Sequence, residues 1–103
     1  MADVYTTGSW RPFRGAEAAF LEAWTEFAAW AASLPGAGAA TLARDLRDPE
    51  RFVSFMAWDD IESVRAWKAS PEFKPRMSRV QEHVDKFSPT EVEVVAAVGS
   101  GQA

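Results

Sequence analysis

Residues 52–73 read FVSFMAWDDIESVRAWKASPEF, and this stretch decides the fold. As far as Trp58, apolar side chains occupy both sets of alternating positions, which indicates a strand with apolar side chains on both faces. Asp59 is followed three residues later by Glu62, a spacing similar to a capping box with aspartate in place of serine. The stretch therefore predicts a strand at residues 51–58 that passes directly into a helix.

The segment before this stretch predicts an antiparallel partner for the strand. Residues 38–44 have strand composition, and residues 48–50 read Asp-Pro-Glu, with proline at the second position of a type I turn. We expect the two strands to pair as a hairpin. The charges around the turn alternate in sign and indicate a solvated loop.

Further upstream, apolar side chains recur with the three- and four-residue spacing of a helix that buries one stripe. They are Phe20, Trp24, Phe27, Ala28, Ala31 and Leu34. The helix is expected to run from Ala16 to just before Pro35-Gly36, where proline disfavours helical geometry and glycine supplies a left-handed turn. Residues 3–10 are rich in Val, Tyr and Thr and predict the first strand.

After the decisive stretch, two prolines interrupt the helical pattern. The helix that follows Asp59 is expected to end near Ser70, and a second helical stretch is expected over residues 71–85, with its prolines in a first turn. Residues 90–98 predict the fourth strand. Residues 99–103 form a small polar tail that is expected to fray.

The resulting order, β-α-β-β-α-β, predicts a ferredoxin-like α+β fold. Both helical regions are expected on one face of a four-stranded antiparallel sheet, in a single domain over residues 1–103 with its core at 3–98. The other sheet face is then uncovered, although residues 52–58 place apolar side chains on it. A second copy of the sheet related by a two-fold axis would bury that face, so we expect a homodimer.

Composition narrows the classes of partner. The net charge of −4 argues against attraction to phosphate backbones, so nucleic acid is not expected as a partner. Cysteine is absent, which excludes disulfides and thiolate metal sites and fits a reducing compartment. The first ten residues lack the pattern of a signal peptide and no apolar run approaches the ~18 residues of a membrane span. We expect a cytoplasmic protein without a membrane partner.

Three segments carry a resemblance to a known family. They are Gly8-Ser9-Trp10 followed by a Phe- and Trp-rich helix after Gly15, residues 52–58, and residues 64–73. Over residues 3–98 the chain resembles the antibiotic-biosynthesis monooxygenases of the dimeric α+β-barrel superfamily. That superfamily includes oxygenases without a cofactor, haem degraders, isomerases and proteins of no known activity, and the fold alone does not fix the reaction.

Two branches of the superfamily can be compared at single positions. In the cofactor-independent branch a tryptophan ends the third strand, with an asparagine four residues before it and a tyrosine beside that asparagine. Trp58 matches the tryptophan, while Ser54 and Phe55 stand at the other two positions. In the haem-degrading branch a histidine follows the second-helix tryptophan by ten residues. Trp67 matches that tryptophan and Met77 stands at the histidine position, so a histidine-ligated haem is not expected.

The resemblance implies an oxygenase that needs no cofactor and no metal, with an aromatic small molecule as substrate. We assign catalytic roles to Trp58, Trp67 and Arg76, which would wall the cavity or stabilise an anion. We assign substrate binding to Ser9, Arg11, Ser54 and Phe73. The alternative for the tryptophans is core packing, and for the arginines it is a solvated surface position.

Other titratable residues have simpler interpretations. His83 lies among charged residues near a helix end, where it is expected to be exposed rather than to act as a general base. A lone histidine without cysteine makes a zinc site implausible, and Asp59 with Asp60 is explained as a helix cap. Two rivals to the oxygenase stay open: a dimeric binding module without catalysis, and an isomerase or cyclase on the same fold.

Overall fold

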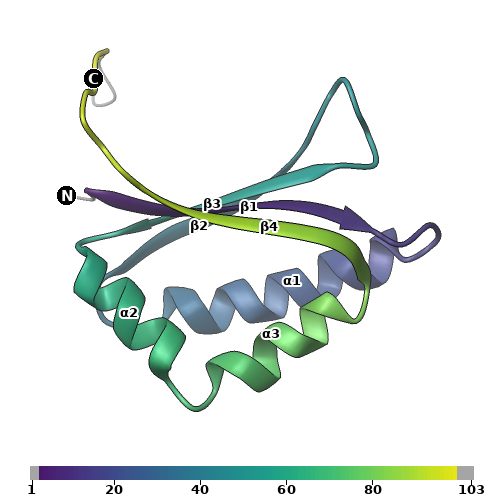
Figure 1. Cartoon of the computed structure of the whole chain (residues 1–103), viewed down its shortest axis with the longest axis horizontal. Coiled ribbons are helices and arrows are strands. Elements are labelled where there is room, and N and C mark those ends of the chain that lie inside the picture. Colours follow the sequence, from purple (N-terminus) through teal and green to yellow (C-terminus); the bar gives the residue numbers. More distant parts are fainter. Residues whose placement is uncertain (1–2, 100–103) are drawn as a thin grey trace.

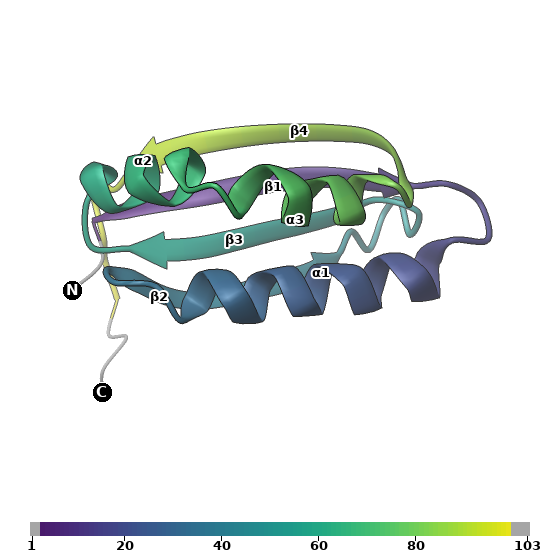
Figure 2. The same ribbon diagram turned by 90° about the horizontal axis from the view of Figure 1, so that it is seen from below.

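The computed structural model describes residues 3–99. In chain order it contains β1 (Val4–Pro12), α1 (Glu17–Ala32), β2 (Ala37–Arg44), β3 (Phe52–Trp58), α2 (Ile61–Ala69), α3 (Phe73–Gln81) and β4 (Val84–Glu93). The strands form one antiparallel sheet in the order β2-β3-β1-β4. All three helices lie on one side of it (Figures 1 and 2). This is the predicted ferredoxin-like α+β fold, with the second helical region divided into α2 and α3.

The two central strands direct alternate side chains toward the helices. In β1 the buried positions begin at Val4 and end at Trp10, and in β3 they begin at Phe52 and end at Trp58. The strands pair with Gly8 opposite Ser54. Each large apolar side chain buried in this way stabilises the fold by roughly 1.5–3 kcal/mol, so this face of the sheet carries the core.

Helix α1 contributes the opposite side of the core through the predicted stripe. Its buried residues are Phe20, Phe27, Ala28 and Ala31. The Phe20 ring lies 5.5 Å from both Trp10 and Phe52, measured between ring centroids. The 3.6-residue period therefore places one aromatic of the helix directly over the two central strands.

The fourth strand was predicted at residues 90–98 and actually covers Val84–Glu93. The prediction followed the apolar run near the C-terminus, but strand pairing with β1 begins among charged residues and continues through Pro89. Proline is tolerated there because β4 is an edge strand with one neighbour only. Val95 and Val98, expected within the strand, are exposed.

Two boundaries in the helical region also differ from the prediction. Helix α3 ends at Gln81 rather than residue 85, because the chain turns into β4, and the carbonyl oxygen of His83 accepts a hydrogen bond from the Phe13 amide. The cap of α2 is Asp60, whose carboxylate accepts from the Ser63 amide at 2.8 Å. The predicted tail lies outside the described residues from position 100 onward.

None of the helices found within residues 3–99 has the length and apolar character needed to cross a membrane.

We predict that Gly36→Ala destabilises the protein more than Gly15→Ala does. Both glycines have positive φ, 82° and 84°, and a side chain in this region costs roughly 1–3 kcal/mol. A Cβ at Gly36 would also lie 2.2 Å from Ser63 Oγ, whereas nothing lies within 4 Å of one at Gly15. Urea unfolding of the two variants measures the difference. Equal losses would show that α2 shifts freely to make room.

Candidate functional site

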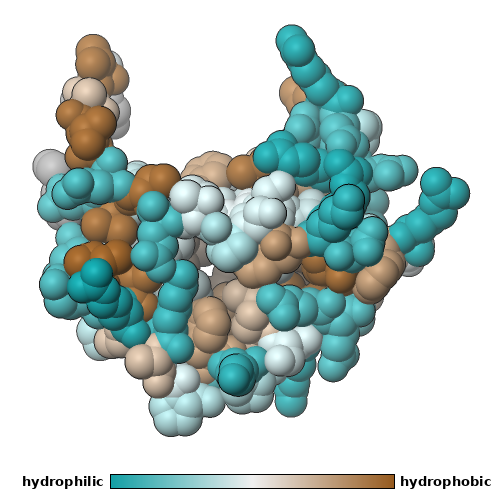
Figure 3. Space-filling view, in the orientation of Figure 1, coloured by the Kyte–Doolittle hydropathy of each residue, from teal (hydrophilic) through white to brown (hydrophobic). Residues whose placement is uncertain are grey.

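A cavity of about 230 Å³ lies between the helices and the sheet. Its floor is formed by β1 and β3 and its roof by α1, α2 and α3. On one side it is bounded by β4, through Phe87 and Pro89, and by the C-terminal ends of α2 and α3, through Lys68 and Gln81. Figure 3 shows a hollow on this side of the molecule, where β4 and the two short helices are nearest the viewer. The cavity is therefore accessible at the edge of the sheet.

The roof is predominantly aromatic. The Trp67 ring lies 5.0 Å from Phe73 in a perpendicular arrangement, and Phe27 lies 5.8 Å from Trp67 and 5.9 Å from Phe73. Trp24 and Met77 extend this surface. Such rings present flat, polarisable walls and fixed rotamers, which suit a planar apolar ligand.

Two buried hydroxyl groups lie on the floor. Ser54 Oγ accepts a hydrogen bond from Trp10 Nε1 at 2.9 Å, and Thr6 Oγ1 accepts one from Trp58 Nε1 at 3.1 Å. Both residues line the cavity and are at most 9% exposed. They provide polar groups in an otherwise apolar enclosure, which is the usual composition of a small-molecule site.

The indole nitrogen of Trp67 differs from those two tryptophans. Trp67 is 7% exposed and lines the cavity, and its Nε1 is buried with no hydrogen-bond partner among the residues that the structure describes. A buried donor without an acceptor destabilises the folded state by roughly 1–3 kcal/mol. Trp67 Nε1 is thus a buried donor that the described part of the chain leaves unpaired.

Lys68 is the charged residue in the cavity lining, and it lies at the opening. Its Nζ is 2.6 Å from Glu91 Oε2 on β4, so the pair joins α2 to the edge strand. The hydrogen bond from Lys68, with the attraction of its charge, lowers the pKa of Glu91. The carboxylate therefore stays ionised and paired at neutral pH.

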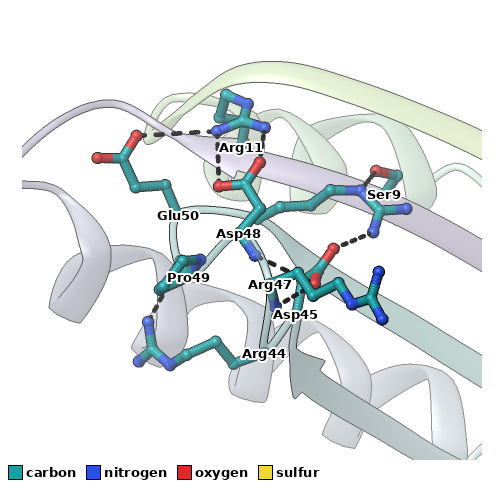
Figure 4. A network of polar contacts seen from close by, with 9 residues as sticks. Ser9, Arg11, Arg44, Asp45, Arg47, Asp48, Pro49 and Glu50 are labelled. Atoms are coloured by element: carbon teal, nitrogen blue, oxygen red, sulfur yellow. Dashed lines mark hydrogen bonds and ion pairs between the residues drawn. The ribbon is translucent and has the colours of Figure 1, made fainter.

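Of the predicted substrate-binding residues, Ser54 and Phe73 line the cavity, and Ser9 and Arg11 do not. The latter two alternate with the buried positions of β1 and belong to the face of the sheet away from the helices. Ser9 accepts a hydrogen bond from Arg51, and Arg11 forms ion pairs with Asp48 and Glu50 of the hairpin loop (Figure 4). The hydrogen bond from Arg11 lowers the pKa of Asp48. These side chains therefore connect β1 to the hairpin loop.

The predicted catalytic residues are also divided. Trp67 forms part of the roof, while Trp58 is fully buried and packs against it at a tilt, with ring centroids 4.9 Å apart. Arg76 is exposed on α3, with its guanidinium 4.8 Å from the Trp30 ring and outside the cavity. His83 does not line the cavity either. The roles of all these residues in binding or catalysis stay predictions.

Several lining residues were not singled out from the sequence. Trp10 and Lys68 are next in sequence to residues that were predicted for the site. Whether their own side chains point into the cavity depends on the strand register and on the phase of the helix. Phe87 lay outside the predicted bounds of the fourth strand, residues 90–98. Its ring stacks on the Trp10 ring, with 3.9 Å between the ring centroids. Within residues 3–99, no three His, Asp or Glu side chains come together in a way that could hold a metal ion.

The chain matches the family model "Antibiotic biosynthesis monooxygenase" over residues 4–76 and belongs to this family. No curated protein sequence matches it. Among solved structures it is similar to SnoaB, a cofactor-independent oxygenase from Streptomyces nogalater, with a TM-score of 0.84, 21% identity, and coverage of 95% of this chain and 98% of that one.

Two further solved structures share the fold at lower identity. A conserved protein from Methanosarcina mazei has a TM-score of 0.80 at 16% identity, covering 90% of this chain and 93% of its own. PA3566 from Pseudomonas aeruginosa has a TM-score of 0.76 at 16% identity, covering 93% and 97%. At these identities the likeness establishes the fold and leaves the substrate open.

We predict that Trp58→Phe destabilises the protein more than Trp67→Phe, by about 1–3 kcal/mol. Both changes shorten a buried indole by the same atoms, but only Trp58 loses a hydrogen bond and leaves the Thr6 hydroxyl without a partner. Urea unfolding without added ligand tests this. A larger loss for Trp67→Phe would show that its Nε1 has a partner in solution.

Proposed function

We propose that this protein is a cofactor-independent monooxygenase that oxidises a hydroxylated aromatic or quinol-type small molecule with O2. The observation that carries the proposal is the aromatic cavity with buried hydrogen-bond donors, in a chain that belongs to this monooxygenase family. An apolar cavity of about 150 Å³ accommodates benzene. The larger volume here, with its accessible side, suits a molecule of roughly two fused rings, with further rings at the opening.

The proposed reaction needs only the substrate and O2. An activated ring CH2 group loses a proton, and the resulting anion transfers one electron to O2. Recombination of the radical pair forms a carbon–oxygen bond and a hydroperoxide. Loss of water then leaves a ketone, so that one oxygen atom enters the product and the other leaves as water, with one O2 consumed per quinone formed.

The side chains contribute binding, orientation and charge stabilisation in this scheme. Trp67 and Phe73 enclose the ring system and keep water from the anion, and Ser54 donates a hydrogen bond to its oxygen. The lining contains no imidazole or carboxylate, so the proton leaves to solvent at the opening near Lys68. The rate should therefore rise with pH along the ionisation of the substrate itself.

The proposal includes a homodimer in the cytoplasm. On the sheet face away from the helices, Phe55 is 40% exposed and Val92 is 43% exposed, next to the smaller apolar side chains of β3. Helices cover only the other face. Packing of two such faces would bury the exposed rings, as in other two-fold assemblies. A lack of cysteine agrees with the proposed compartment.

A binding module without catalysis is the second candidate. Within residues 3–99 the lining has no imidazole or carboxylate, which favours this candidate over an isomerase or cyclase, because those enzymes must move a proton between carbons. A carrier or sensor would use the same walls and the same donors. Turnover alone separates it from the oxygenase.

We predict oxygen uptake when the purified protein is incubated with anthrones and quinols, above a heat-denatured control, with one O2 consumed per quinone. Trp67→Ala should lower the rate more than it lowers the folded fraction at the assay temperature, because a wall of the cavity is lost. His83→Ala should stay within a few-fold of wild type, since loss of a general base costs about 10²–10⁴-fold. Binding without uptake across the panel would favour the carrier.

We predict a mass of twice 11.4 kDa by light scattering at micromolar concentration. Phe55→Lys should shift the protein toward monomer, because the proposed packing of the two sheets would bury an unpaired lysine charge from each chain. Lys74→Glu, an exposed change on α3, is the matched control. A wild-type monomer at this concentration would contradict the dimer.

A further inference from the structure

We propose that Trp10 and Trp58 act as positioning residues that fix the Ser54 and Thr6 hydroxyls as hydrogen-bond donors, so that the cavity selects ligands with a carbonyl or phenolate oxygen. This inference rests on the proposed function, because it assumes that the ligand occupies this cavity. It deepens that function by naming the feature of the ligand that is recognised.

The first step concerns the direction of the hydrogen bonds. An indole N–H can only donate, so each hydroxyl oxygen must accept from its tryptophan. One lone pair of each hydroxyl is then occupied. Across residues 3–99, neither hydroxyl gives its own proton to a protein acceptor. Each buried O–H is left with a proton to donate, and both residues line the cavity.

The second step concerns Gly8, which lies between the two pairs on β1. A Cβ at this position would lie 2.8 Å from Trp10 Nε1 and 2.9 Å from Ser54 Oγ. Only glycine leaves room for this hydrogen bond beside the strand. Stacking of Phe87 on the Trp10 ring at 3.9 Å fixes the indole from its other side.

The third step concerns the balance of donors and acceptors. The two hydroxyls and the unpaired Trp67 Nε1 give three buried donors, from the floor and the roof. The lining includes no carboxylate, and its one charged side chain is the cation Lys68. A donor-rich apolar enclosure stabilises an acceptor or anionic oxygen and disfavours a ring without one, because its donors would then stay unpaired.

The test compares two bicyclic probes of similar shape, 1,4-naphthoquinone and naphthalene, by equilibrium dialysis. Because the protein contains no cysteine, the quinone has no thiol to add to. Wild type should bind the quinone at least about tenfold more tightly than naphthalene. Ser54→Ala should reduce this ratio by about five- to tenfold, with naphthalene affinity nearly unchanged.

Trp10→Phe tests positioning, since it removes the N–H and keeps a ring. It should lower the ratio about as much as Ser54→Ala does, and the double variant should lower it no further, because the two residues act as one unit. Thr6→Val and Trp58→Phe form an independent second cycle. Ser88→Ala, on the edge strand opposite Ser9, is the matched control and should leave the ratio unchanged.

If the ratio of quinone to naphthalene affinity is unchanged in both Ser54→Ala and Thr6→Val, the inference is wrong. It is also wrong if neither probe binds to the wild type. An unchanged ratio in both Trp→Phe variants, with a lower one in Ser54→Ala, would overturn the positioning role. Oxygen uptake is measured separately. Oxygen uptake together with an unchanged affinity ratio in the variants would support the oxygenase and contradict the selection by hydroxyl donors. A ratio that falls as expected without oxygen uptake would support the selection by hydroxyl donors in a protein that binds without catalysis.

Discussion

The contact between Trp58 and Trp67 holds the two layers of the molecule in their relative positions. Trp58 ends β3, and the chain enters α2 three residues later, so the strand and helix are joined at a short corner. The two indoles pack against each other across that corner, tilted by 33° with their ring centroids 4.9 Å apart. Because α2 is anchored there, α3 continues along the sheet, and the space enclosed between α1, α3 and the floor becomes the cavity rather than solid core.

Polar groups inside this enclosure follow from the same arrangement. A buried indole needs an acceptor for its N–H, and on β1 and β3 the nearest suitable groups are Thr6 and Ser54. Hydrogen bonds that stabilise the core therefore also fix the hydroxyls that face the cavity. Trp67 lies on the roof, and no acceptor within residues 3–99 reaches its Nε1. The Ser54 and Thr6 hydroxyls that the buried indoles require as acceptors are therefore the same groups that we propose bind the ligand.

The sequence was sufficient for the fold and for part of the site. The helical period of α1 and the alternation of β3 placed these two elements nearly at their observed bounds, because each buries one continuous face. Strand composition and the Asp-Pro-Glu turn placed β2. The edge strand β4 was misplaced because it buries little and its pairing with β1 is set by hydrogen bonds that leave no apolar pattern. Ser54 and Phe73, chosen with the help of the family resemblance, line the cavity, and their roles in binding stay predictions.

Arg11 and Ser9 show why the rest of the site could not be predicted. Both lie on β1, where a shift of one residue moves a side chain to the other face of the sheet. Trp10, between them, points into the cavity, and its neighbours point away from it. The positive charges chosen from the sequence also had closer partners: Arg11 pairs with Asp48, and Arg76 lies on Trp30.

The composition of the lining bears on the proposed oxidation. Within residues 3–99 the cavity lining has no imidazole or carboxylate to take up a proton, and in the proposed reaction the electrons for O2 come from the substrate. What remains for the side chains is to bind an electron-rich oxygen and keep water away from it, which requires only donors and aromatic walls. Those are features that this core already contains, because its buried tryptophans Trp10 and Trp58 need both hydrogen-bond partners and packing. In the proposed function the ring system that fits the cavity decides the substrate, which agrees with the general finding that one fold hosts many functions.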